Sequence, residues 1–141
     1  VLPPQASLQS LGVRDGATLT AHTRAASLAA TGAAFALLRS DGRVVTWGDS
    51  DRGGDSSNVR EKLFAVHSLT ATAFGAFAAL KTDGSVVTWG NPGYGGSSDS
   101  VRARLTGVQQ ITASAGAFAA LRADRSVVTW GHKCFGGDSR A

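Results

Sequence analysis

Hydrophobic and polar positions alternate along two short stretches in the middle of the chain, and the same arrangement occurs three times. Residues 69–72 and 76–81 have the period of two that is typical of strands. In the second stretch Phe77 and Ala79 fall on one face, and the positions between them fall on the other. We therefore predict two neighbouring strands in each copy.

A turn and a returning strand follow. Asp83 and Gly84 are typical of a hairpin, because glycine accepts positive φ and aspartate bonds to its own backbone. Residues 86–89 read Val-Val-Thr-Trp, and β-branched and aromatic residues favour strands. The fold class predicted is mainly β, with a β-hairpin plus one extra strand in each unit. The corresponding turns are Asp41-Gly42 in the first copy and Asp124-Arg125 in the third.

A helical period comes next. Val101, Leu105 and Val108 stand at positions i, i+4 and i+7, which is the spacing of one helix face. The first copy repeats this spacing at Val59, Leu63 and Val66. We therefore predict a short helix in each of the first two units. The candidate N-caps are Ser56, Ser57, Ser98 and Asp99, and the candidate stop in the second copy is Gly107.

Three tryptophans fix the frame of the repeat. They lie 42 and 41 residues apart, and each closes a Val-Val-Thr-Trp-Gly sequence. A phenylalanine stands twelve residues before each tryptophan, and glycine and alanine flank Phe77 and Phe118. A fixed period of this size is typical of an array of one supersecondary unit. We predict that these rings form the structural core of the repeats: Phe35, Trp47, Phe77, Trp89, Phe118 and Trp130.

The repeats are expected to cover residues 24–141, at about 24–68, 69–110 and 111–141, with the last incomplete. Residues 1–23 form a different leader. Its spacing of Leu8, Leu11 and the Asp15-Gly16 turn resembles the end of a ubiquitin-like domain; the alternative is an irregular leader that packs on the first repeat. Because the chain starts with Val1 and contains no methionine, we expect it to be a fragment or a processed product.

Residues 78–90, Tyr94-Gly95 and residues 108–114, with their counterparts in the other copies, resemble the repeats of the regulator of chromosome condensation 1 (RCC1) family. The resemblance implies blades of a β-propeller, here a partial propeller-like array of about 42-residue units. The period is shorter than is usual in the family, and Gly-Gly-Asp or Gly-Gly-Ser replaces Gly-Gln-Leu-Gly. A propeller needs about four to eight blades, so we expect the open ends to be covered by further repeats, by other chains or by a larger assembly.

The charge is weakly informative. The chain has 14 lysines and arginines against 10 acidic residues, a net charge of +4, and the basic residues are spread through every repeat. This favours a solvated, mildly basic surface, with nucleic-acid binding through distributed arginines as an alternative. No apolar run is long enough to span a bilayer, and a single cysteine, Cys134, excludes an internal disulfide framework. These features do not determine the cellular compartment.

Catalytic and metal sites are not expected. The three histidines, His22, His67 and His132, fall at unrelated positions of the repeat, and no Ser-His-acid set can be proposed. His132 and Cys134 offer two ligands where zinc normally takes four. The acidic stretch 49–55 is matched in the second copy by residues without a carboxylate, which argues against calcium. We therefore predict a protein without enzymatic activity, cofactor or metal.

The position before each Gly-Gly pair varies, as recognition residues on a rigid scaffold do. It holds Arg52, Tyr94 and Phe135, which either contact a partner or lie over the next repeat. The expected function is protein–protein interaction or scaffolding. One alternative is an accessory structural subunit docked on a large complex, such as an organellar or photosynthetic membrane complex. Another, which the resemblance implies, is a ubiquitin-ligase-associated or chromatin-binding module.

Overall fold

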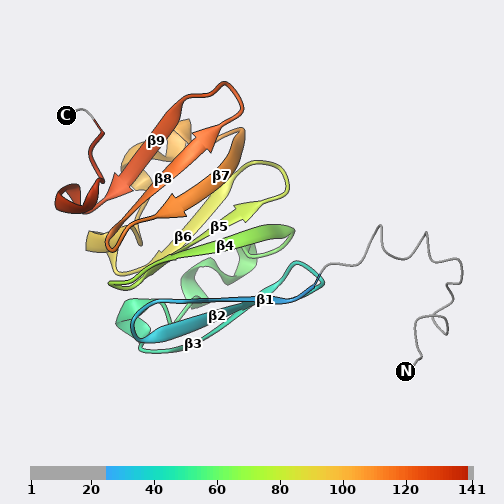
Figure 1. Cartoon of the computed structure of the whole chain (residues 1–141). Coiled ribbons are helices and arrows are strands. Elements are labelled where there is room, and N and C mark those ends of the chain that lie inside the picture. Colours follow the sequence, from blue (N-terminus) through green and yellow to red (C-terminus); the bar gives the residue numbers. More distant parts are fainter. Residues whose placement is uncertain (1–24, 140–141) are drawn as a thin grey trace, which may run out of the picture.

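The computed structural model describes residues 25–139, which form three consecutive three-stranded antiparallel sheets, stacked in chain order (Figure 1). The predicted mainly β repeat array is confirmed. The ubiquitin-like leader predicted for residues 1–23 lies outside the described residues. The strands are β1 (Ser27–Ala30), β2 (Ala34–Leu38) and β3 (Val44–Gly48), then β4 (Val66–Thr72), β5 (Ala76–Lys81) and β6 (Val86–Gly90), then β7 (Val108–Ala113), β8 (Ala117–Arg122) and β9 (Val127–Gly131).

Short 3-10 helices follow the sheets, and no described helix is long and apolar enough to cross a membrane. The short helix predicted in the second unit is confirmed; it ends at Arg104, shortly before the predicted stop at Gly107, and Val108 begins β7. The chain bends between them at Gly107, which has φ 63°. The helices are η2 (Ser50–Arg52), η3 (Ser57–Lys62), η4 (Pro92–Tyr94), η5 (Asp99–Arg104) and η6 (Lys133–Phe135).

The first unit follows the same pattern. Its short helix η3 ends at Lys62, and Val66 begins β4 after a bend at Ala65 with φ 53°. The backbone N–H of Val66 donates to the carbonyl of Gly42 in the preceding hairpin turn at 3.1 Å. The apolar spacing therefore arises from a helical turn and the next strand that share one core.

Two of the candidate N-caps stand at the N-cap position, but their side chains do not cap the helix. Ser56 and Ser98 are the N-cap residues of η3 and η5, yet neither side chain bonds to the helix backbone. Their hydroxyls instead pair with strand threonines, Ser56 with Thr46 at 2.9 Å and Ser98 with Thr88 at 3.0 Å. These serines thus tie each helix to the sheet of its own repeat.

Each sheet carries one stacked Phe–Trp pair. The strand register places the phenylalanine directly opposite the tryptophan, and such cross-strand pairs stabilise a sheet. The ring centroids are 5.7 Å apart in the first sheet, 5.4 Å in the second and 5.3 Å in the third. The pairs are Phe35–Trp47, Phe77–Trp89 and Phe118–Trp130.

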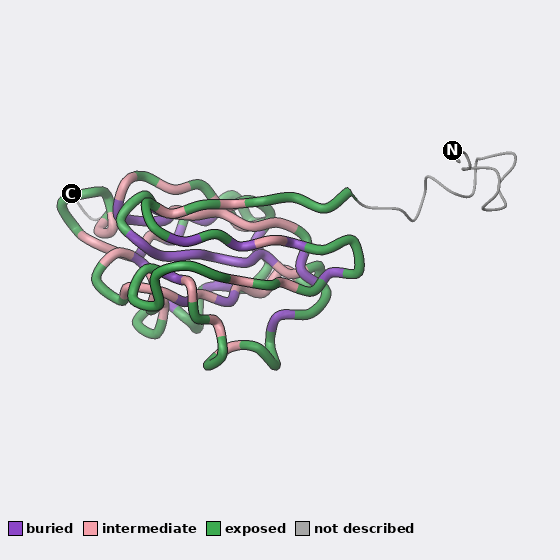
Figure 2. The backbone as a smooth tube through the Cα atoms, turned by 90° about the horizontal axis from the view of Figure 1, so that it is seen from below, coloured by how far each residue is buried: buried purple, intermediate pink, exposed green. Residues whose placement is uncertain are grey.

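The hydrophobic core lies between neighbouring sheets. One cluster joins the first and second repeats and another joins the second and third. The middle strand β5 is buried from Ala76 to Leu80, because it has a sheet on either side (Figure 2). Alanines on the facing strands allow this close approach, and burial of these apolar faces stabilises the stack.

The Phe–Trp pairs of the second and third sheets face the preceding repeat. The prediction that all three pairs form the core is wrong for the first pair, which is exposed. Trp89 and Trp130 are only 4% and 2% exposed, whereas Phe35 and Trp47 are 47% and 46% exposed. The reason is that no sheet precedes the first one within the described residues. Identical residues are therefore core in two repeats and surface in the other.

A hydrogen bond closes each junction between sheets. The indole Nε1 of Trp89 donates to the carbonyl of Gly53 in the first repeat at 3.1 Å. Trp130 Nε1 makes the equivalent bond to the carbonyl of Gly95 at 3.1 Å. Both bonds are buried, so each tryptophan satisfies its polar atom by reaching back one repeat.

The same glycines make room for the phenylalanines. A Cβ atom added at Gly53 would lie 2.5 Å from the Phe77 ring, and one at Gly95 would lie 2.6 Å from the Phe118 ring. Both glycines also have positive φ, 102° and 105°. At both internal junctions, the first glycine of the Gly-Gly pair thus leaves the space that the phenylalanine of the next repeat fills.

The third hairpin turn carries strain that the other two avoid. Arg125 has φ 74°, at the position where Gly42 and Gly84 have φ 85°. This left-handed conformation costs a residue with a Cβ about 1–2 kcal/mol. Arg125→Gly is therefore expected to raise the free energy of unfolding by about 0.5–1 kcal/mol, after the entropy cost of glycine.

Urea denaturation would measure this gain, and Arg125→Ala is the matched control because it removes the charge but keeps the strained Cβ. A gain equal in both variants would mean that the charge, and not the backbone, destabilises the turn.

Candidate functional site

Four aromatic side chains from loops of the second and third repeats gather at one place, and we call them the aromatic cluster. Phe74 lies 5.2 Å from Tyr94 and 5.2 Å from Phe135, between ring centroids. His132 lies 5.6 Å from Tyr94 and 5.3 Å from Phe135, which closes the circle of contacts. Phe74 and Phe135 remain 38% and 37% exposed.

A capped turn positions each of these loops. His132 Nδ1 accepts a hydrogen bond of 3.1 Å from the backbone N–H of Cys134, so η6 is capped by the imidazole. Asn91 caps η4 in the same way through Oδ1, which accepts from Gly93 N at 2.9 Å. The acceptor role of Nδ1 places the proton of a neutral His132 on Nε2.

A second bond fixes the backbone of the variable position. The Thr72 hydroxyl donates to the carbonyl of Tyr94 at 3.1 Å, and the Ser114 hydroxyl donates to the carbonyl of Phe135 at 2.6 Å. The cap and this second bond together fix the main chain at the position before each Gly-Gly pair. The side chain at that position can therefore vary without altering the conformation of the loop.

The cluster also depends on close packing over a glycine. A Cβ atom added at Gly116 would lie 2.9 Å from the rings of both Tyr94 and Phe135. Phe74 stands in the turn between β4 and β5, at the repeat position that holds Gly32 and Ala115 elsewhere. That difference from the repeat pattern is the sequence signal by which Phe74 could have been found.

The three predicted partner-contact residues are not all together. Tyr94 and Phe135 both join the cluster, and Tyr94 also lies over Gly116 of the next repeat. Arg52 lies at the preceding junction, where its Cβ would be 3.0 Å from a Cβ added at Gly75. The cluster therefore combines two of the predicted positions with Phe74 and His132.

Hydrogen bonds lower the pKa of three exposed turn carboxyls. The Ser85 hydroxyl donates to Asp83 at 2.6 Å and, with the Ser85 backbone N–H, holds the pKa of that carboxyl below its usual value. Ser126 does the same to the pKa of Asp124 at the third hairpin turn. The Asp55 pKa is lowered by Ser57 at the start of η3. These carboxylates organise turns and do not face a common site.

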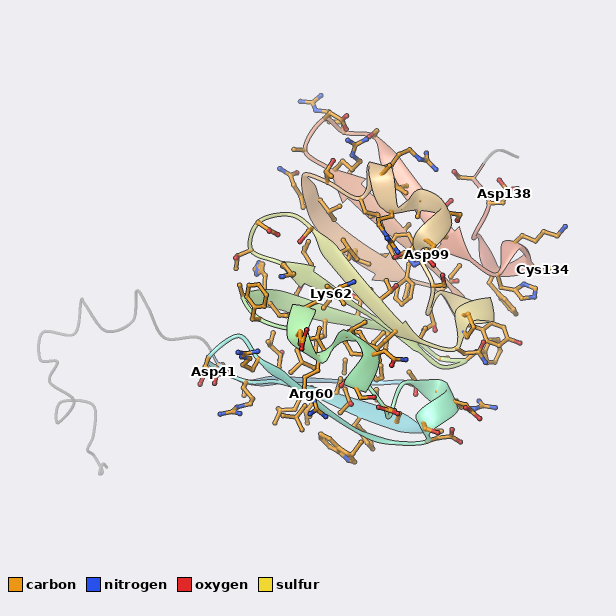
Figure 3. All side chains as sticks on the ribbon, turned by 180° about the vertical axis from the view of Figure 1, so that it is seen from behind. Asp41, Arg60, Lys62, Asp99, Cys134 and Asp138 are labelled. Carbon is orange, nitrogen blue, oxygen red and sulfur yellow. The ribbon has the colours of Figure 1, made fainter. Side chains whose placement is uncertain are left out.

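A polar groove of about 760 Å³ lies between η5 and β9 and is lined in part by Asp99, Arg104, Lys133 and Asp138. Figure 3 shows Cys134 at the outer end of the third repeat, away from Asp99. Between residues 25 and 139, no group of three or more His, Cys, Asp or Glu side chains could hold a metal ion. Neither His132 nor Cys134 lines the groove.

No protein-family model and no curated protein matches the chain. Several solved structures share its fold, among them the two that follow. Human WBSCR16 superposes with a TM-score of 0.54 at 20% identity, over 74% of this chain and 32% of that one. Yeast RCC1 (Prp20), in a crystal structure with Kap60, superposes with a TM-score of 0.55 at 22% identity, over 74% and 29%.

The structural similarity to RCC1-repeat proteins expected from the motifs is confirmed. The three sheets match part of an RCC1 β-propeller, and the chain spans about a third of the length of the proteins it matches.

Proposed function

We propose that this chain is a non-catalytic protein-binding module in which a propeller-like scaffold presents the aromatic cluster to a protein partner. The observation that carries the proposal is the cluster itself: Phe74 and Phe135 stay more than a third exposed although each packs on neighbouring rings. A loop side chain that contacts only solvent would not need to pack on neighbouring rings.

Aromatic side chains are enriched in the centres of protein interfaces because they bury a large area with few rotatable bonds. Here the rings support one another, and the backbone of the loops is held by the bonds to Tyr94 and Phe135. Little conformational freedom is therefore left to lose on binding, which favours affinity.

The fold adds support of a more general kind. Yeast RCC1 is bound to another protein, Kap60, in its crystal structure. The proposal that the chain is non-catalytic is supported by the placement of its described histidines. His67 lies in β4, whereas His132 caps η6 with its Nδ1.

A second candidate is an accessory structural subunit of a large complex. It is favoured by the exposed Phe35–Trp47 pair, which presents a stacked aromatic face at the first sheet. In that case the contact surface would be the end of the array and not the aromatic cluster.

The test compares proteins captured from a nuclease-treated lysate of the source cells by the unchanged chain and by Phe74→Ser/Phe135→Ser. We expect the double variant to lose at least one partner by about tenfold or more, as interface hot spots do. Phe64→Ser is the control, because Phe64 is 47% exposed but lies under Lys81 Nζ, 3.7 Å from the ring centroid.

Partners retained by the double variant would place binding elsewhere and contradict the proposal. Partners lost equally by the control would indicate nonspecific apolar capture. Capture that appears only when the nuclease is left out, and that falls steeply with salt, would favour the nucleic-acid alternative.

A further inference from the structure

One loop position of the repeat caps a short helix in all three copies, and its chemistry is different in the third. Asp49 and Asn91 each accept a hydrogen bond of 2.9 Å through Oδ1 from the backbone N–H two residues later. His132 makes the equivalent bond through Nδ1, which accepts from the N–H of Cys134 at 3.1 Å. These bonds begin η2, η4 and η6, the helices that end at the variable position before each Gly-Gly pair.

The third cap depends on the protonation of its acceptor. A carboxylate or an amide oxygen accepts hydrogen bonds at any pH near neutrality, whereas an imidazole accepts at Nδ1 only while it is neutral. A protonated imidazole carries an N–H at both ring nitrogens, so turning the ring over does not restore an acceptor. Histidine is also the only side chain whose ordinary change of charge falls between about pH 5 and 8. Of the three caps, the one at His132 is therefore the one that a fall in pH can remove.

His132 lies where a change of its charge reaches the aromatic cluster. Its ring stacks on Tyr94, with centroids 5.6 Å apart and planes inclined by 17°, and meets Phe135 edge-on at 5.3 Å. Its carbonyl accepts from the N–H of Phe135 at 2.9 Å, and its own N–H donates to the carbonyl of Gly116 at 2.9 Å. Because these contacts hold the ring and the backbone, a proton gained at Nδ1 is directed at the N–H of Cys134.

The groups around the imidazole leave the change of charge near neutrality to His132. The segment of η4 faces it with the phenol of Tyr94, and the β4–β5 and β7–β8 turns contain no ionisable side chain. The charged or titratable groups on its own segment are Lys133, Cys134 and Asp138. None of these side-chain types ordinarily changes charge between about pH 5 and 8. A transition in that range is therefore assigned to the imidazole.

We propose that His132 makes the aromatic cluster sensitive to pH, so that protonation of the imidazole removes the cap of η6, releases Phe135 from the other rings and weakens the binding of a protein partner. The last step rests on the function proposed above. The direction follows from the bond, since the cap is present while the imidazole is neutral and is lost as the pH falls. The loops capped by Asp49 and Asn91 do not respond, because their acceptors are oxygens.

NMR spectroscopy of the ¹⁵N-labelled chain between about pH 5 and 8 tests the switch without a partner. Hydrogen exchange of the Cys134 amide is compared with that of Gly93, its counterpart under the Asn91 cap, so that the general pH dependence of exchange cancels. We expect the protection of Cys134 relative to Gly93 to fall about fivefold or more as the imidazole gains its proton, because a capping bond contributes about that factor. Nuclear Overhauser effects between Phe135 and Phe74 are expected to weaken over the same range.

His132→Asn is the decisive variant, because Asn91 shows that an asparagine caps this turn. It is expected to keep the Cys134 amide protected and the ring contacts unchanged across the whole range. His67→Asn is the matched control, since His67 lies in β4, and it is expected to leave the pH response intact. A response that persists in His132→Asn, or a Cys134 amide that stays protected while the imidazole of His132 gains its proton, would overturn the switch.

The effect on binding is measured with a partner captured through the aromatic cluster from the lysate. The unchanged chain is expected to bind it about fivefold or more weakly at about pH 5.5 than at about pH 7.5, relative to His132→Asn at the same two pH values. The ratio removes any titration of the partner. An equal pH dependence of the two chains would contradict the regulation of binding, whereas a switch seen by NMR in a chain that captures no partner would contradict the proposed function alone.

Discussion

Trp89→Ala and Trp130→Ala are each expected to lower the free energy of unfolding by about 3–5 kcal/mol, whereas Trp47→Ala costs about 1 kcal/mol or less. All three stand in the same Val-Val-Thr-Trp-Gly sequence and stack on a phenylalanine. The difference arises because only Trp89 and Trp130 pack against a preceding repeat and donate to its glycine carbonyl.

Urea denaturation followed by circular dichroism would measure the three losses, at dilutions where the chain is monomeric. Trp47→Ala is the internal control, since it deletes the same side chain from the same local sequence. Equal losses at all three positions would mean that Trp47 is also covered in solution, and that the first sheet is not an open end of the monomer.

Gly53→Ala and Gly95→Ala are expected to be the next most damaging changes, at about 2–5 kcal/mol each. About 1–2 kcal/mol comes from placing a Cβ at positive φ, and about 1–3 kcal/mol comes from overpacking against the phenylalanine ring. Gly136→Ala carries the first cost without the second, because the space beside Gly136 is empty. The difference between the variants therefore measures the overlap alone.

The same denaturation experiment would measure this difference, again on monomeric protein. If Gly136→Ala proved as costly as Gly53→Ala, the loss of stability would come from the backbone conformation, and not from filling the space that the next repeat occupies.

The strands and hairpins could be predicted from the sequence because their signals are local. A period of two and an Asp-Gly pair depend on neighbouring residues alone, as at Phe77 and Gly84. The periodicity alone could not place the end of the helix. Val101, Leu105 and Val108 share one hydrophobic cluster, but Val108 belongs to β7, and only the glycine at position 107 marks the stop between helix and strand.

Burial at the ends of the array was beyond the sequence for a different reason. Trp47 and Trp89 stand in the same Val-Val-Thr-Trp-Gly sequence, and their burial differs only because a sheet precedes Trp89.

Only part of the aromatic cluster could be predicted from the sequence. Tyr94 and Phe135 occupy a variable loop position, but Phe74 enters from another turn, and its distance to them depends on how the repeats stack.

The sameness of the two internal junctions bears on how an array of this kind changes length over generations. Each link uses the same aromatic pair and the same glycine, and contacts run between neighbouring repeats. Duplicating or deleting the DNA for one whole unit would therefore recreate a working link with no other change. Gain or loss of part of a unit would separate a tryptophan from its glycine, so selection should tolerate the first kind of event far more readily than the second.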